Sequence, residues 1–168
     1  MTSFNLRNVK LRSGEAFRDE VDVAVAPLEF GGQRYVQVPE NVSAELSIAR
    51  ASTGTVFELR FESRLHGPCQ RCLADAVVER TIAAREYQAT NPGPSEELRT
   101  PYVADDRLDL SAWARDSIAL ELPEQILCRP DCAGLCPVCG KDLNAEPHEH
   151  VEERLDPRWE KLSRLRQE

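Results

Sequence analysis

Four cysteines lie within one stretch of twelve residues, at Cys128, Cys132, Cys136 and Cys139. Thiolates are the preferred ligands of structural zinc, which binds four ligands in a tetrahedron. Because these cysteines are close in sequence, they can reach one ion with little loss of loop entropy. The spacing therefore predicts one tightly bound zinc ion, held mainly by these four residues.

The second half of this stretch has the sequence of a zinc knuckle, from Cys136 to Gly140. A Cys-x2-Cys pair places two sulfurs on one side of a metal, and a following glycine lets backbone amides turn toward the thiolates. Gly134 allows the chain to reverse between the two cysteine pairs. Downstream, either His148 or His150 could replace Cys128 as a ligand. The alternative is that both histidines lie in a solvated acidic segment, and this alternative is slightly favoured.

A second Cys-x2-Cys pair occurs far upstream, at Cys69 and Cys72. It could complete a zinc site with Cys136 and Cys139, form a redox pair, or remain two reduced thiols in a tight turn. A redox pair of the thioredoxin type needs a helix N-terminus after it to lower the thiol pKa. The residues that follow here indicate a strand, which disfavours redox catalysis.

The first half of the chain must position this pair, and its pattern is that of strands. Apolar and polar residues alternate in the segments 21–25, 34–39, 44–48 and 56–65, and Gly31-Gly32 marks a turn. A further extended stretch covers about 76–87, so the upstream cysteines are expected at the tip of a hairpin. In the clearest strand, residues 57, 59, 61 and 65 should be buried and residues 58, 60, 62 and 64 exposed.

The pattern changes after a polar, proline-rich connection over residues 91–107. Apolar residues then recur at helical spacing from Leu110 to Leu120, with Asp109 or Ser111 as the cap and Pro123 after the end. Asp156-Pro157 predicts the start of a final helix. The chain is thus predicted to be α+β: a strand-rich antiparallel core (1–90), the polar loop (91–107), and a helix, zinc-knuckle loop and C-terminal helix (108–168) that form one compact unit with the core.

The charge of the chain, −8 in total, is concentrated in its C-terminal half. Residues 1–90 carry 11 Lys or Arg and 12 Asp or Glu, whereas residues 91–168 carry 10 and 17. Such a chain is a poor general binder of phosphate backbones. Direct RNA contact is therefore expected to be weak, and Arg60, Arg64 and Arg71 on the hairpin are the candidates for it. The alternative, somewhat favoured, is a solvated face on which arginines pair with Glu58 and Glu62.

The sequence shows none of three common signatures of enzymes: a nucleophile paired with a base, a phosphate-binding glycine loop, or paired carboxylates. The chain is therefore not expected to be an enzyme or to have a small-molecule substrate. It has no apolar run of the length that spans a bilayer, about 20 residues. The N-terminus lacks the apolar core of a signal peptide. A cytoplasmic protein without a membrane partner is expected.

Several motifs together resemble those of the YceD family, the large ribosomal RNA subunit accumulation proteins. They are Cys69-Gln70-Arg71-Cys72-Leu73, the segment Leu108–Pro123, the segment Cys128–Asn144, and Asp156-Pro157-Arg158-Trp159 with Leu162 and Leu165. The resemblance covers about the last 110 residues. There is one departure, because many relatives carry a cysteine where this chain has His148-Glu149-His150.

The resemblance implies a bacterial protein of the cytosol that supports 23S rRNA synthesis, accumulation or large-subunit assembly, with a pre-ribosomal particle or a ribosomal protein as partner. The alternative is a zinc-ribbon adaptor that binds proteins outside ribosome biogenesis. The residues themselves leave open the zinc ligand set, the step of rRNA maturation and the oligomeric state.

Overall fold

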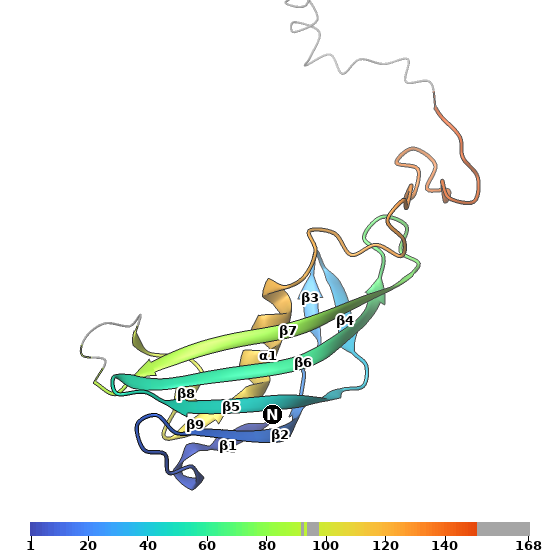
Figure 1. Ribbon diagram of the computed structural model, residues 1–168. Coiled ribbons are helices and arrows are strands. Elements are labelled where there is room, and N and C mark those ends of the chain that lie inside the picture. Colours follow the sequence, from blue (N-terminus) through green and yellow to red (C-terminus); the bar gives the residue numbers. More distant parts are fainter. Residues whose placement is uncertain (92, 94–97, 151–168) are drawn as a thin grey trace, which may run out of the picture.

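The computed structural model describes residues 1–91, 93 and 98–150 (Figure 1). A six-stranded antiparallel sheet makes up most of this part of the chain. Its strands follow the order β2-β5-β6-β4-β3, and β7 pairs with β6 along its whole length. The strands are β2 (Ala16–Ala24), β3 (Leu28–Phe30), β4 (Gln33–Gln37), β5 (Asn41–Arg50), β6 (Gly54–Pro68) and β7 (Asp75–Ala89).

The alternation predicted for the central strand is confirmed except at Glu58, which is half-buried. Side chains 57, 59, 61 and 65 of β6 are buried, whereas residues 60, 62 and 64 are exposed. The two long strands form the predicted hairpin, with Gly54 opposite Ala89 at one end and Pro68 opposite Asp75 at the other. The upstream Cys-x2-Cys pair lies in the turn between them, as expected.

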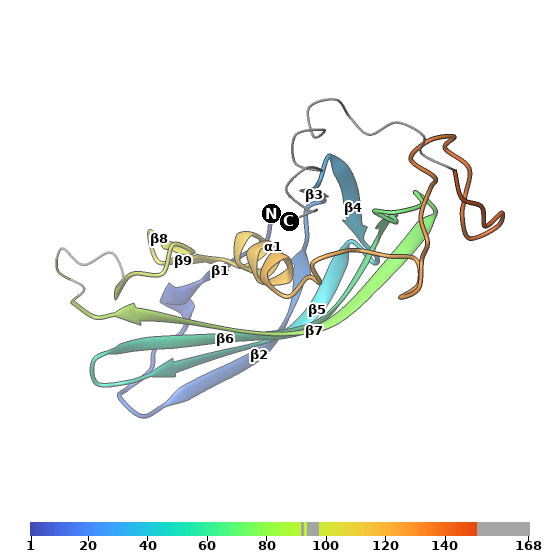
Figure 2. The same ribbon diagram turned by 90° about the horizontal axis from the view of Figure 1, so that it is seen from above.

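A single α-helix, α1 (Leu110–Leu120), occurs among the described residues, with the bounds that the sequence predicts. Of the two candidate caps, Asp109 is the one used, because its Oδ1 accepts a hydrogen bond of 3.0 Å from the N–H of Ala112. Trp113, Ala114 and Ile118 are buried in the main core. Figure 2 shows that the helix lies on one face of the large sheet.

A small second sheet lies on the same side as the helix (Figure 2). Its strands, in the order β1-β9-β8, are β1 (Ser3–Asn5), β9 (Arg107–Asp109) and β8 (Val103–Ala104), and the 3-10 turn η1 (Leu6–Asn8) follows β1. The end of the segment predicted as a polar loop therefore contains β8. Strands of two or three residues are too short to give an alternation signal, so the sequence could not reveal this sheet.

The predicted α+β class is wrong. The described residues are strand-rich, with antiparallel sheets and one α-helix. The small sheet adds strands next to the helix. Residues 121–150 form turns, as expected for the cysteine loop, so α1 is the one α-helix in the described part of the chain. The predicted C-terminal helix from Asp156 lies outside the described residues. No helix in the described part of the chain has the length and apolar character needed to cross a membrane.

A second, smaller core lies at the hairpin tip. It consists of Tyr35, Cys69, Ala76, Val78, Ile126 and Cys132. Figure 1 shows the chain running from the end of α1 to this tip and then projecting beyond it. The two regions of the chain that carry cysteines therefore meet at one end of the molecule.

Candidate metal centre

The turn at the hairpin tip is shaped by its own backbone. The N–H of Cys69 donates to the carbonyl of Ala74 at 2.7 Å, and the N–H of Leu73 donates to the carbonyl of Cys69 at 3.0 Å. Leu73 has a φ of +63°, a left-handed conformation that is uncommon for a residue with a side chain. This tight turn brings Cys69 and Cys72 together at the tip.

The loop after α1 is fixed to this turn by reciprocal hydrogen bonds. The N–H of Gln70 donates to the carbonyl of Ile126 at 2.8 Å, and the Gln70 side-chain oxygen accepts from the N–H of Ile126 at 3.2 Å. Further on, the N–H of Leu135 donates to the carbonyl of Arg71 at 3.1 Å. Gly134, with a φ of +82°, is so close that a Cβ there would lie 3.2 Å from Arg71. Residues more than fifty positions apart thus form one unit.

One group of four sulfurs lies between the turn and this loop. It consists of Cys69, Cys72, Cys128 and Cys132, whose Sγ atoms all lie within 4.8 Å of one another. The Sγ atoms of Cys69 and Cys132 are 3.8 Å apart, and those of Cys72 and Cys128 are 3.5 Å apart. In a tetrahedral zinc site with Zn–S bonds of about 2.3 Å, sulfurs lie about 3.8 Å apart. The spacing therefore fits a metal with four thiolate ligands.

The second group lies further along the projecting loop. It consists of Cys136, Cys139, His148 and His150, whose ligand atoms also lie within 4.8 Å of one another. His148 Nε2 is 3.1 Å from the Sγ of Cys139, and its Nδ1 is 2.7 Å from the carbonyl oxygen of Glu146. A metal-binding histidine typically donates its other ring N–H to such a carbonyl, which fixes the tautomer. This group therefore fits a metal with two sulfur and two nitrogen ligands.

Each group contains one cysteine whose surroundings favour the thiolate. Burial alone would raise the pKa of Cys69, but backbone N–H groups, those of Cys72 and Arg71 among them, lower it to about 6. In the second group, the backbone N–H of Cys139 is the main cause that lowers the pKa of Cys136 to about 6. In contrast, the Cys72 thiol and then burial raise the pKa of Cys128 to about 12. The thiolate is the form that binds metals, so Cys69 and Cys136 are the members of the two groups whose surroundings favour binding of a cation.

The eight candidate ligands from the sequence are thus all brought into one of two groups. The four cysteines that the spacing assigned to one ion are divided equally between them. The upstream pair joins Cys128 and Cys132 rather than Cys136 and Cys139. Both histidines lie with the knuckle pair Cys136 and Cys139.

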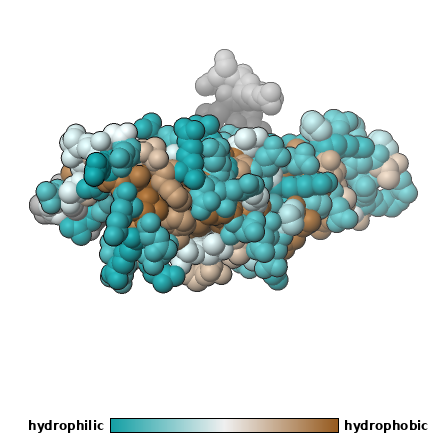
Figure 3. Space-filling view, turned by 60° about the horizontal axis from the view of Figure 1, so that its bottom comes forward, coloured by the Kyte–Doolittle hydropathy of each residue, from teal (hydrophilic) through white to brown (hydrophobic). Residues whose placement is uncertain are grey.

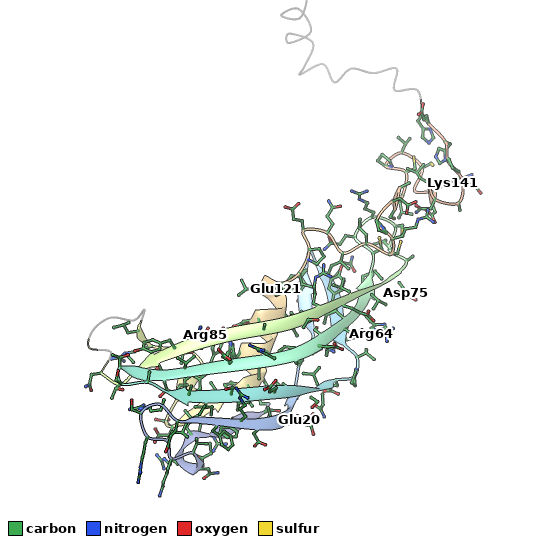
Figure 4. The ribbon with its side chains drawn as sticks, viewed as in Figure 1. Glu20, Arg64, Asp75, Arg85, Glu121 and Lys141 are labelled. Atoms are coloured by element: carbon green, nitrogen blue, oxygen red, sulfur yellow. The ribbon has the colours of Figure 1, made fainter. Side chains whose placement is uncertain are left out.

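The three arginines proposed for RNA contact have different surroundings. Arg60 and Arg64 are exposed on the sheet, at 3.9 Å from Glu58 and 3.3 Å from Glu79 respectively. Figure 4 shows Arg64 on the hairpin, well separated from Lys141 in the projecting loop. The Arg71 guanidinium instead donates to the side chain of Gln125 and to the carbonyl of Cys132, at 3.1 and 3.0 Å. Arg71 therefore supports the first group structurally.

On the face drawn in Figure 3, hydrophilic residues predominate, and apolar residues show between them over the left and middle of the molecule. Exposed apolar side chains do occur at the tip. Leu73 follows the first knuckle pair and is 56% exposed, and Val138 lies within the second and is 61% exposed. Val77, near the tip on β7, is 43% exposed.

Sequence reasoning missed the residues that support the ligands. The Asn144 amide donates to the Sγ of Cys132 at 3.6 Å, and its Oδ1 accepts from the N–H of Ala133 at 2.8 Å. The Glu146 carbonyl, which contacts His148, is a backbone atom and carries no sequence signal. Asn144 falls inside a motif of the family resemblance, which was the one available indication of its importance.

Comparisons with known proteins place these residues in a broader context. The family model described as "Large ribosomal RNA subunit accumulation protein YceD" matches residues 57–166, which include all six cysteines and both histidines. No solved structure matches the chain.

Curated relatives match the chain as well. An uncharacterized protein of Mycobacterium tuberculosis is 37% identical over 122 residues, covering 70% of this chain and 58% of the relative. The uncharacterized protein YlbN of Bacillus subtilis is 27% identical, covering 65% of this chain and 64% of the relative. "Large ribosomal RNA subunit accumulation protein YCED homolog 1, chloroplastic" of Zea mays is 46% identical over 42 residues, 25% of this chain and 14% of the relative. The chain thus spans less than two thirds of these relatives' length.

Proposed function

Since the chain belongs to the YceD family, we propose that it is a non-enzymatic factor that supports 23S rRNA accumulation or assembly of the large ribosomal subunit. The observation that carries this proposal is the family match, which extends over the hairpin, the helix and both groups of candidate ligands. The YceD homolog of Zea mays carries the same description in its name. This supports a ribosome-related role.

The charges of the molecule favour action through a protein partner rather than through naked RNA. The arginines on the sheet face lie near carboxylates, with Arg60 and Arg85 both within 4.0 Å of Glu58 and Arg64 near Glu79. An interface with RNA gains its affinity from cations that neutralise phosphates, and paired arginines supply few of them. The acidic C-terminal half is better suited to a basic ribosomal protein, because complementary charge accelerates encounter.

The tip of the hairpin is the surface that we assign to this partner. Leu73 and Val77 are exposed there, and Val138 is exposed in the second cysteine turn, beside backbone that is hydrogen-bonded within the two turns. Exposed apolar side chains on hydrogen-bonded turns are typical of the centre of a protein interface. The metal would serve this surface by fixing the turns, without taking part in a reaction.

Profiling of ribosomal RNA in a deletion strain tests the proposed role. The large-subunit rRNA should fall relative to the small-subunit rRNA, and a plasmid copy of the gene should restore the ratio. An unchanged ratio, together with absence of the protein from ribosomal fractions, would contradict the proposal and favour an adaptor that acts outside ribosome biogenesis.

Sedimentation of tagged variants tests the proposed route. Reversal of the exposed charges in Arg60→Glu/Arg64→Glu should reduce association with pre-ribosomal particles less than Cys136→Ser/Cys139→Ser does. Arg71 is left unchanged, since its guanidinium supports the loop. The opposite ranking would mean that the sheet face, rather than the tip, contacts the particle.

A further inference from the structure

The two Cys-x2-Cys turns have the same backbone hydrogen bonds. In the first, the N–H of Cys69 donates to the carbonyl five residues on, and the N–H of Leu73 donates back to Cys69. In the second, the N–H of Cys136 donates to the carbonyl of Lys141 at 2.8 Å, and the N–H of Gly140 donates back to Cys136 at 2.9 Å. The fourth residue after the first cysteine has a positive φ in both turns, +63° and +72°.

This repetition matters because each such turn supplies one half of a tetrahedral site. A Cys-x2-Cys turn presents two sulfurs to a metal and needs two further ligands from elsewhere. If both turns shared one ion, their sulfurs would have to lie together. Instead, each turn has its own second pair of ligands within 4.8 Å.

The two ligands that complete each site differ between the two turns. Cys128 and Cys132 complete the first, with sulfur–sulfur distances of 3.8 and 3.5 Å across the two pairs. His148 and His150 complete the second, and His148 has its Nδ1 on a backbone carbonyl so that Nε2 is directed to the cysteines. All eight candidate ligands are used once, and none is left over.

We propose that the chain binds two zinc ions rather than one, a four-thiolate ion at the hairpin tip and a second ion held by Cys136, Cys139, His148 and His150. The second ion lies in the projecting loop and is the more exposed, because Cys139 and His150 are exposed. This inference concerns metal content and is independent of the proposed role in rRNA accumulation.

The zinc content of three variants distinguishes this arrangement from the alternatives. Native mass spectrometry of protein purified under reducing conditions should give two zinc ions per chain. The variant His148→Ala/His150→Ala should keep one zinc ion, that of the four-thiolate site. The variant Cys69→Ser/Cys72→Ser should also keep one zinc ion, that of the second site. The control His66→Ala, which changes a histidine outside both groups, should keep two.

Each other outcome overturns the proposal. One zinc in the natural protein that survives both double variants would indicate a single ion on Cys128, Cys132, Cys136 and Cys139. One zinc that is lost only when Cys69 and Cys72 are replaced would indicate a single ion that needs the upstream pair, with no ion on the histidines.

Zinc X-ray absorption spectroscopy measures the average number of sulfur and nitrogen ligands per zinc. This second test does not require the cysteine variant to fold. Four thiolates at one ion, with two thiolates and two imidazoles at the other, average to three sulfurs and one nitrogen per zinc. The natural protein should show this average, and the histidine double variant should shift to four sulfurs. A first shell of four sulfurs in the natural protein would contradict the second site.

Discussion

Replacement of Trp113 by alanine should destabilise the sheet while leaving the metal groups intact. The Trp113 side chain is 1% exposed and belongs to the main core, where its ring stacks on that of Tyr102 at 6.1 Å. Truncation of a buried tryptophan typically costs about 3–5 kcal/mol, because it removes apolar contacts and leaves a cavity. With a urea m-value of about 2 kcal/mol/M, a loss of about 4 kcal/mol lowers the unfolding midpoint by about 2 M.

The measurement is urea unfolding followed by far-ultraviolet circular dichroism, with zinc present in excess. Leu120→Ala is the matched control, because Leu120 lies on the same helix and is 86% exposed. It should change the free energy of unfolding by less than about 0.5 kcal/mol. Zinc content in the absence of urea should be unchanged in both variants, because the main core and the tip core have no buried residue in common and meet at the partly buried Phe30 and Leu122, which both variants keep. A shift below about 0.5 M for Trp113→Ala would refute the docking of α1 on the sheet.

Two further substitutions test single hydrogen bonds. Tyr35→Phe removes the 2.9 Å bond from the buried tyrosine hydroxyl to the carbonyl of Pro68, and should lower the free energy of unfolding by about 1 kcal/mol; Tyr87→Phe, whose hydroxyl is exposed, should have almost no effect in the same urea titration. Asp109→Ala removes the cap of α1 and should cost about 1 kcal/mol, most of which Asp109→Asn should restore, as measured by thermal unfolding. Equal losses in the two Asp109 variants would contradict the capping role.

Much of the architecture near the cysteines could be predicted because its signals are local. The alternation in β6 is long enough to identify a strand and its buried face, and the spacing of Leu110, Trp113 and Ile118 identifies the helix. The resemblance to the YceD family, carried by motifs from Cys69 onward, is confirmed. The class assigned to the chain was wrong, since the strands that pair residues 3–5 with 107–109 are too short to leave a pattern.

The grouping of the ligands could not be predicted because sequence distance is a poor guide to it. Cys132 and Cys136 are four residues apart but lie in different groups. Gly134 lies between them with a left-handed backbone, and the chain turns there, so that Cys132 and Cys136 join different groups of ligands. Cys69 reaches Cys132 only because two long strands bring the turn to the loop, and this depends on the register of the whole sheet. The left-handed Leu73 gave no signal either, since such positions are usually recognised by glycine.

The four-sulfur group joins residues 56 and 63 positions apart, so a metal there would act as a cross-link on the unfolded chain. By analogy with a disulfide, closing a loop of this length lowers the entropy of the unfolded state by an amount equivalent to about 4 kcal/mol, against roughly 2.5 kcal/mol for a loop of about ten residues such as that from Cys139 to His148. The first ion would therefore stabilise the tertiary fold as a whole, whereas the second would order only the loop around it. The abundance of the folded protein in the cell would then depend on zinc supply mainly through the ion of the four-sulfur group.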